Sequence, residues 1–326
     1  MLIFLLAALQ PVPATDGVRI FGDWAVACDN VHACEMTSLL PGEAGIPDDD
    51  HSGDLSVARA AGPAGGFTIE VSVEAADGPA TLAIDGAAAT RGTLRGNVLR
   101  IAGAEAARIA PLLANGKAVE LQDAAGKGVA LISLAGASAA LRFIDANQGR
   151  AGTVTAAVAK GSRPASAVPP AQPLPRIVAL RPSGTAAPVS AALRGSLEKR
   201  SGCDENYADG EERPAIDRYA LGGGKTLVLI PCGAGAYNFS SAAFILAGGK
   251  ADAATFDQGD DVLVNADFDK GVLSAHEKGR GVGDCGEGRS YVWNGRSFEL
   301  IEVRSMPDCR GSANWLRIFH AEPVFR

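Results

Sequence analysis

The fold class is decided by the stretch Phe67-Thr68-Ile69-Glu70-Val71-Ser72-Val73-Glu74, in which apolar and polar residues alternate without a fault. A period of two sends successive side chains to opposite faces of a β-strand. We therefore expect a strand with one face in a core and the other in water. Weaker strand patterns surround it, separated by clusters of Gly, Asp and Pro, at 24–28, 55–57, 81–84 and 97–101. Together these patterns predict an antiparallel sandwich.

Two Ala-rich stretches, 104–114 and 137–147, have the length and residue types of helices and are expected to cover that sheet. The chain of 326 residues contains 40 Gly and 18 Pro but only 6% aromatic residues, which favours a turn-rich β protein. The predicted fold class is mostly β with minor helices, built as β-sandwich-like domains with antiparallel sheets and stabilised by disulfides.

The chain length favours two domains, and a change in composition indicates where they separate. Seven prolines stand between Lys160 and Pro188 among Ala, Ser, Val and Arg, a composition typical of an extended linker. We predict an N-terminal β domain over 15–158, a Pro/Ala-rich linker over 159–190 and a C-terminal β domain over 191–326. A docking segment for a proline-binding groove is the alternative role of the linker.

The first residues predict export. A short apolar run, Met1 to Leu9, is followed by Val12-Pro13-Ala14, the small-residue pattern that signal peptidase requires. We expect a signal peptide over 1–14 with cleavage after Ala14, and a periplasmic or secreted protein without a transmembrane segment after cleavage. A buried N-terminal strand is the alternative.

Six cysteines support the same compartment. None forms a C-x-x-C pair, so three disulfides are the economical interpretation. The distribution along the chain favours the pairs Cys28–Cys34, Cys203–Cys232 and Cys285–Cys309 among the 15 possible connectivities. Closing each of the two C-terminal loops is expected to stabilise the fold by about 3 kcal/mol.

Two patterns describe the second domain. The apolar run 226–231 predicts a strand buried on both faces. An Asn294-Gly295 pair between two strand-like runs predicts a hairpin with a two-residue turn. That register places Tyr291 opposite Phe298 and Cys285 opposite Arg304, close enough to Cys309 for a disulfide at the base of the hairpin.

Several stretches carry a resemblance to a known family: Phe21–Trp24 with Cys28 and Cys34, Asp145–Arg150, Pro231–Asn238, Lys278–Gly286 and Trp293–Phe298. They resemble a bacterial family of exported proteins, domain of unknown function family 1176. The first half is also similar to the invasion-associated locus B family. The resemblance implies a periplasmic or secreted protein and supplies no catalytic residue.

The stretch 278–285 is the candidate site, because alternating glycines bring backbone amides together near Lys278 and Arg280. Such a loop can bind a phosphate, a carboxylate or an acidic glycan. The alternative is a structural bulge beside the disulfide, with Arg280 paired to Asp284. The loop leads into the predicted hairpin, so the candidate binding residues are Lys278, Arg280, Asp284 and Trp293.

Other function classes lack their signatures. The net charge of −7 argues against a nucleic-acid partner. The glycines at 222–224 lack the first glycine of a phosphate-binding loop, since Tyr219 stands there. The S-x-x-K match at 196–199 lacks its companion motifs, and the polar stretch 265–271 departs from a calcium loop and favours a hairpin turn. No catalytic residue, metal or cofactor is expected.

The sequence therefore favours a non-enzymatic exported module that binds an envelope or extracellular protein or glycan. An envelope hydrolase with a non-local catalytic site is one alternative, because triads are recognised in space rather than in sequence. A secreted enzyme inhibitor that presents the Asn294-Gly295 tip is the other.

Overall fold

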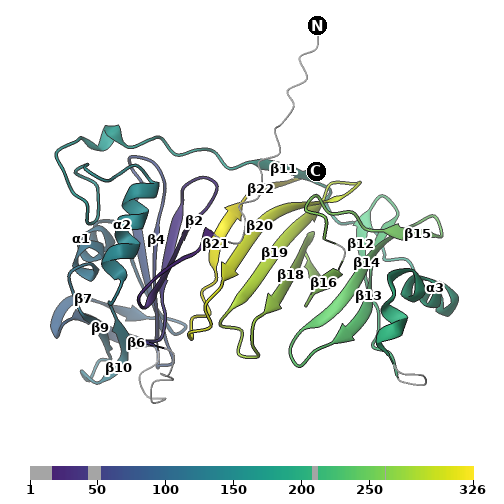
Figure 1. Ribbon diagram of the computed structural model, residues 1–326, viewed down its shortest axis with the longest axis horizontal. Helices are drawn as coiled ribbons and strands as arrows, with labels where there is room; N and C mark the ends of the chain where they lie inside the picture. The colour runs from purple at the N-terminus through teal and green to yellow at the C-terminus, as the bar shows by residue number, and fades with distance from the viewer. Residues whose placement is uncertain (1–16, 43–52, 208–211, 261) are drawn as a thin grey trace, which may run out of the picture.

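A computed structural model describes residues 17–42, 53–207, 212–260 and 262–326. The predicted signal peptide lies outside these ranges. The described chain is mostly β, with several antiparallel sheets and three α-helices, which confirms the predicted fold class (Figure 1).

The first half of the chain contains two antiparallel sheets and two helices. Sheet I has the strand order β1-β2-β3-β4-β5-β8, and sheet II has the order β10-β9-β6-β7. The bounds in sheet I are β1 Arg19–Phe21, β2 Trp24–Cys28, β3 Cys34–Ser38, β4 Gly53–Arg59, β5 Phe67–Val73 and β8 Val98–Ala102. Those in sheet II are β6 Gly78–Ile84, β7 Ala87–Leu94, β9 Ala118–Gln122 and β10 Gly128–Ser133, and the helices are α1 Gly103–Leu113 and α2 Ala137–Asn147.

The alternating stretch forms β5 as expected. Ile69 and Val71 are fully buried in a core that sheet I shares with sheet II and both helices, whereas Thr68, Glu70 and Ser72 lie on the opposite face. The Ala-rich stretches form α1 and α2, which pack Ile109 and Leu141 into the same core.

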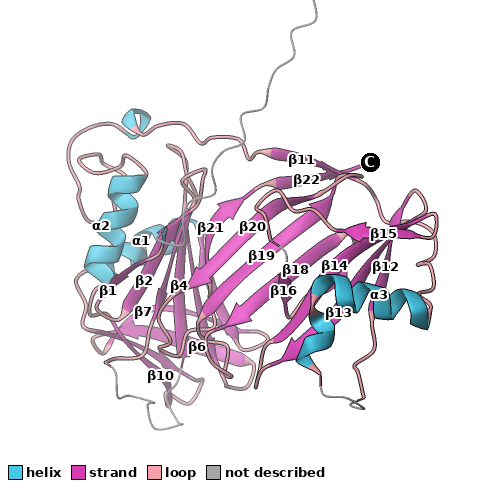
Figure 2. Ribbon diagram, turned by 45° about the vertical axis from the view of Figure 1, so that its right-hand side comes forward, coloured by secondary structure: helices cyan, strands magenta, loops and turns pink. Residues whose placement is uncertain are grey.

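The second half contains sheets III and IV and helix α3 (Ala191–Ser201). In sheet III the strands are β12 Asp217–Gly222, β13 Lys225–Ala234, β14 Phe239–Ala247, β15 Lys250–Ala253 and β16 Val262–Val264. In sheet IV they are β17 Asp267–Asp269, β18 Val272–Lys278, β19 Gly286–Trp293, β20 Phe298–Met306 and β21 Leu316–His320. Figure 2 shows the broad face of these sheets with α3 beside β13.

Strand β13 confirms the prediction of a strand buried on both faces. Leu227 and Leu229 pack into a core shared with sheet IV, whereas Val228 and Ile230 pack into a separate core under α3. Leu197 of α3 is fully buried in that second core.

The predicted hairpin exists, but its predicted register is wrong. Trp293 pairs with Phe298 and Tyr291 with Leu300, so the loop has four residues, Asn294 to Ser297. The Asn294 Oδ1 accepts hydrogen bonds from the N–H groups of Arg296 and Ser297 at 2.7 and 2.9 Å, which stabilises this longer turn. As a result Arg304 lies opposite Gly288 rather than Cys285.

The segment predicted as a linker, 159–190, contains a short 3₁₀ helix (Ala165–Ala167) and strand β11 (Arg176–Ala179). Strand β11 pairs in parallel with β22 (Glu322–Phe325). Ala179 is fully buried in the core of sheets III and IV, so this end of the segment is fixed to the second half.

The structure forms the three disulfides that the sequence favoured, Cys28–Cys34, Cys203–Cys232 and Cys285–Cys309. Within the described ranges, no helix has the length and apolar character needed to span a membrane.

Candidate functional site: a groove where sheets I and IV meet

The two halves of the chain join where β21 packs against β2 and β3, and Figure 1 shows β21 beside β2. Ala25 and Ala27 of β2 are fully buried in the same core as Leu316 and Ile318 of β21. The small alanine side chains permit close approach of the two sheets. Strand β2 is therefore buried on both faces, because Trp24 and Val26 belong to the core of the first half.

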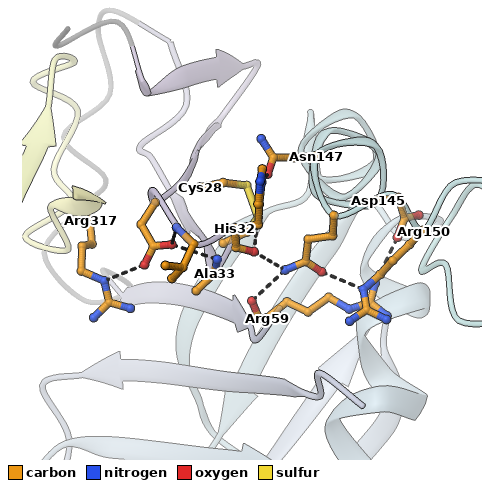
Figure 3. The surroundings of a disulfide bond; sticks show 12 residues. Cys28, His32, Ala33, Arg59, Asp145, Asn147, Arg150 and Arg317 are labelled. Atoms are coloured by element: carbon orange, nitrogen blue, oxygen red, sulfur yellow. Dashed lines mark hydrogen bonds and ion pairs between the residues drawn. A yellow bond between two sulfur atoms is a disulfide. The ribbon is translucent and has the colours of Figure 1, made fainter. Parts of the chain in front are cut away.

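Ionic contacts extend this junction beside the Cys28–Cys34 disulfide. Arg317 of β21 lies 3.4 Å from Asp29 and 3.5 Å from Glu35, and Figure 3 shows its side chain directed toward this disulfide loop. Asn30 donates to the carbonyl of His320 at 3.1 Å and accepts from the His320 N–H at 2.8 Å. These bonds satisfy the backbone groups of His320 at the edge of β21 without a neighbouring strand.

The loop between β20 and β21 makes a second set of contacts with the first half. Arg310 donates to the carbonyl of Gly22 at 2.6 Å and pairs with Asp23 at 3.3 Å. The hydroxyls of Thr37 and Ser312, both fully buried, lie 3.0 Å apart. The junction is thus fixed by packing, ion pairs and buried hydrogen bonds together.

A polar groove opens along this junction. Its first part has a volume of about 540 Å³ and lies between the outer face of sheet I and the β20–β21 loop. Polar side chains lining it are Glu35, Ser56, Thr68, Glu70, Arg100 and Arg304. The water-facing side of β5 that the alternation predicted is therefore one wall of a groove.

The groove continues over sheet IV as a second cavity of about 450 Å³. Both cavities are lined by Arg304, Ala313 and Trp315, so these residues mark the point where they meet. The second cavity is also lined by Ser274, His276, Lys278, Gly283, Ser290 and Glu302.

The indole of Trp315 is held in a fixed orientation. Its Nε1 donates to the carbonyl of Gly283 at 3.1 Å. The ring lies over two glycines of β19, since a Cβ on Gly286 would meet it at 2.7 Å and one on Gly288 at 3.6 Å. The His276 ring approaches it edge-on, with 6.4 Å between the centroids. Trp315 is half-buried, so part of the ring borders the groove.

Arg304 is also held in place. It donates to the carbonyl of Trp315 at 3.0 Å and pairs with Glu302 at 3.1 Å and Glu35 at 3.7 Å. These partners come from β20, the β20–β21 loop and β3, so Arg304 connects both walls of the groove. A guanidinium has five donors, and this arrangement leaves capacity for a further acceptor.

His276 is the titratable ring of the second cavity. Burial lowers its pKa, and the nearby charge of Lys278 lowers it further, so the site favours the neutral form of the ring. In the described parts of the chain its ring nitrogens bond to neither Ser274, Ser290 nor Glu302. The cavity therefore gathers polar groups without forming a nucleophile–base pair.

Three of the four predicted site residues lie in or next to one loop, and two of these, Arg280 and Asp284, do not line either cavity of the groove. Lys278 lines the second cavity, and the loop after it forms one side of that cavity. Arg280 donates from Nε to Asp284 at 2.7 Å, and the buried Asp284 accepts from the Gly311 N–H at 2.7 Å. Hydrogen bonding from Arg280 lowers the pKa of Asp284 despite its burial. The pair ties the glycine loop to the β20–β21 loop.

Trp293 lies elsewhere. It stands at the opposite end of β19 from the partner of Lys278, and it is only 2% exposed in the core beside Phe298. Its position is that of a core residue.

Trp315 and Arg304, at the centre of the groove, are among the lining residues that the sequence alone does not indicate. The sequence pattern that points to such a contact is Gly-x-Gly at 286 and 288. Two glycines on one face of a strand leave room for an aromatic side chain to pack against the backbone. The loop that supplies that aromatic residue could not be deduced from spacing.

A buried polar cluster lies on the other side of the Cys28–Cys34 disulfide, as Figure 3 shows. Gln148 donates to the carbonyl of His32 at 2.8 Å and accepts from Arg150 Nε at 2.7 Å. Asp145 pairs with Arg59 at 3.0 Å. The stretch Asp145–Arg150 thus holds the end of α2 against the disulfide loop. Its role is structural.

Comparisons with known proteins agree with the resemblance seen in the sequence. The profile of the family described as "Protein of unknown function (DUF1176)" matches residues 18–322. The Uncharacterized protein YpfG of Escherichia coli (strain K12) is 30% identical over 345 aligned positions, covering 96% of this chain and 93% of that protein. The crystal structure of invasion associated protein B from Bartonella henselae is 20% identical with a TM-score of 0.32, covering 40% of this chain and 98% of that one.

Proposed function

Because the chain belongs to the DUF1176 family, we propose that it is an exported, non-enzymatic module that binds a component of the bacterial envelope. The binding site in this proposal is the groove between sheets I and IV. The six cysteines, all paired, and the apolar stretch at 1–9 support export.

The observation that carries the proposal is the position of Trp315. A half-exposed indole with a fixed orientation lies where two polar cavities meet, at the junction of the two halves of the chain. Sites between domains with a few oriented polar groups around an aromatic side chain are typical of ligand binding. The groove is also rigidly supported on both sides, so little ordering entropy opposes binding.

The arrangement of His276 supports binding over catalysis. A hydrolytic site needs a nucleophile in hydrogen-bond reach of its base and a third group that orients the base. In the described part of the chain, the His276 ring contacts Trp315 and has no hydrogen bond to Ser or to a carboxylate.

Photo-crosslinking in intact cells tests the proposal. A crosslinking amino acid replaces Ala58, an exposed residue on the groove wall, and in a control it replaces Ala253, an exposed residue of β15. We expect saturable capture of envelope material from position 58 only, and loss of capture when Trp315→Ala is added. Equal capture from both positions, or capture that persists in Trp315→Ala, would contradict a groove site.

Cell fractionation and N-terminal sequencing test export separately. A mature protein that begins after Ala14 and is recovered from the periplasm or the medium is the expected result. Recovery of the full-length chain from the cytoplasm would contradict the proposed compartment and leave the groove experiment to be repeated with purified envelope.

A further inference from the structure

We propose that the ligand of this groove is an uncharged polysaccharide chain, one pyranose ring of which stacks on the indole of Trp315. This inference rests on the proposed function and adds the chemical class of the ligand. It is carried by three features of the groove: the aromatic platform, the paired charges and the use of sheet faces rather than sheet edges.

The aromatic platform suits the face of a sugar ring. The C–H groups on one side of a pyranose form an apolar surface, and their weakly positive hydrogens are attracted to the negative face of an indole. Trp315 is fixed by the hydrogen bond to Gly283 and by its packing over Gly286 and Gly288. A platform that is already ordered loses little conformational entropy when a ring stacks on it.

The guanidinium groups of the groove are paired with carboxylates, which disfavours an ionic ligand, whereas Lys278 of the second cavity has no ion pair among the described residues. Arg304 pairs with Glu35 and Glu302, and Arg100 pairs with Glu70. Arg289, which lines the second cavity, pairs with Asp260 at 2.9 Å and Glu287 at 2.8 Å. A polyanion would have to share each guanidinium with these carboxylates, whose negative charges would repel it.

The same pairs suit a ligand rich in hydroxyl groups. Each sugar hydroxyl both donates and accepts, so it can bond a carboxylate and a guanidinium at the same time. Carboxylate and guanidinium groups stand next to one another at the Arg304–Glu302 pair and again at the Arg100–Glu70 pair. Ser56, Thr68 and Asn314 add short neutral donors and acceptors along the wall.

The groove is long enough for several sugar units. Its first part spans β3, β4, β5 and β8 of sheet I, and strands in a sheet are about 4.8 Å apart, so this wall is about 14 Å wide. The second cavity continues past Trp315 onto β18 and β19. Trp315 therefore lies within the path of an extended chain rather than at its end.

An extended peptide fits less well. Peptides in extended conformation are usually bound by adding a strand to a free sheet edge. Here the walls are faces of sheets I and IV, and the edge of β21 is bonded by the side chains of Asn30 and Glu35. A peptide in this groove would thus contact side chains and form few hydrogen bonds to the protein backbone.

Tryptophan fluorescence provides the test, because the chain has three Trp residues and two of them, Trp24 and Trp293, are buried. The purified mature protein is titrated with the tetramers of N-acetylglucosamine and of glucose, and with envelope glycan strands freed of peptide. Inorganic polyphosphate is the charged control. We expect saturable change in emission with at least one neutral glycan and none with polyphosphate.

Substitutions in the groove test whether the sugar ring stacks on Trp315. Trp315→Ala is expected to weaken binding at least about tenfold, as truncation of a central aromatic anchor does, whereas Trp315→Phe retains part of the affinity. Calorimetry replaces fluorescence for these variants. Leu131→Ala, at an exposed position of sheet II, is the matched control and should bind normally. If Trp315→Ala lowers the melting temperature, Glu302→Gln serves as the second groove variant with the same expected loss.

The outcomes separate the two proposals. Failure of every neutral glycan to bind, or equal binding by the groove variants, overturns the polysaccharide inference. If crosslinks from position 58 then capture a protein, the binding function stands with a different ligand. If position 58 captures nothing and no glycan binds, both proposals fall.

Discussion

Asp145 and Arg59 form an ion pair at 3.0 Å in which neither side chain is more than 4% exposed. Asp145 also accepts hydrogen bonds from the N–H groups of Ala157, Val158 and Ala159 at 2.8 to 3.1 Å. One carboxylate thus fixes the end of α2, strand β4 and the start of the Pro-rich segment. Burial, together with the nearby charge of Arg150, lowers the pKa of Arg59 to about 10, although Asp145 acts to raise it.

Asp145→Ala is expected to destabilise the protein by about 3 to 5 kcal/mol, because it leaves a buried guanidinium without its partner. Urea denaturation followed by circular dichroism measures the change in the free energy of unfolding. Asp252→Ala, which removes the exposed ion pair with Lys250, is the control and should change it little. Similar losses in the two variants would show that burial does not govern the effect.

The contribution of Asp54 to the stability of the protein should fall as the pH rises from about 4 to 6. Burial raises the pKa of Asp54 to about 6, against hydrogen bonds from Ala313 and Ser312 that lower it. In this window the folded state holds a proton on Asp54 that the unfolded state has lost, so unfolding becomes easier as the pH increases. Above pH 6 the folded protein bears the full free-energy cost of ionising the buried Asp54 carboxyl. Below pH 4 this cost is absent.

Asp54→Asn removes this titration and keeps an oxygen for the Ala313 N–H. We expect the variant to be more stable than the parent at pH 7, by at most about 3 kcal/mol, and to show a flatter pH dependence. Urea midpoints between pH 4 and 7.5 measure both effects. A variant whose midpoints parallel those of the parent would contradict this assignment.

Gly286 and Gly288 should differ sharply in their tolerance of a side chain. A Cβ on Gly286 would lie 2.0 Å from the carbonyl oxygen of Glu277 and 2.7 Å from the Trp315 ring, and its φ is +144°. At Gly288 the nearest atom, of the Trp315 ring, is 3.6 Å away, which is ordinary contact. Gly286→Ala is therefore expected to cost about 2 kcal/mol or more, because backbone has to move.

Gly288→Ala is the matched variant and should leave both stability and Trp315 emission nearly unchanged. Thermal melts and the emission maximum of Trp315 measure the two effects. Equal behaviour of the two variants would contradict the close approach of Gly286 to the Glu277 carbonyl and to Trp315.

The disulfides should contribute unequally. Replacing Cys285 and Cys309 by Ser opens a loop with a sequence separation of 24, and replacing Cys28 and Cys34 opens one with a separation of 6. Chain entropy predicts losses of about 3 and about 2 kcal/mol respectively. Denaturation of the two double variants measures the loss in the free energy of unfolding for each disulfide. A larger loss from the shorter loop would show that native contacts outweigh chain entropy.

The sequence could predict what depends on neighbours along the chain. The alternation of residues 67–74 gave a strand and its two faces, and the Ala-rich stretch 137–147 gave α2. The Asn294-Gly295 pair located a hairpin but not its loop length, because the Asn294 side chain stabilises a four-residue turn as well as a two-residue one.

The groove could not be predicted in this way. Its walls come from β3–β5 with β8 and from β18–β21, and its contacts, such as Arg304 with Glu35, join residues more than two hundred positions apart. A single sequence does not specify which polar sheet faces lie next to each other in the folded protein. Lys278 and the glycine loop were found because their composition is unusual, whereas Trp315 stands in a stretch without any local signal.

The double burial of β2 restricts how the length of this chain can vary. Alternate residues of β2 serve two different cores, with Trp24 and Val26 on one side and Ala25 and Ala27 on the other. Insertion or deletion of one residue would exchange the two sets, bringing an indole against β21 and methyl groups into the first core. A one-residue change in the length of β2 would therefore disrupt both cores at once, whereas a substitution in β2 affects the core that its side chain faces.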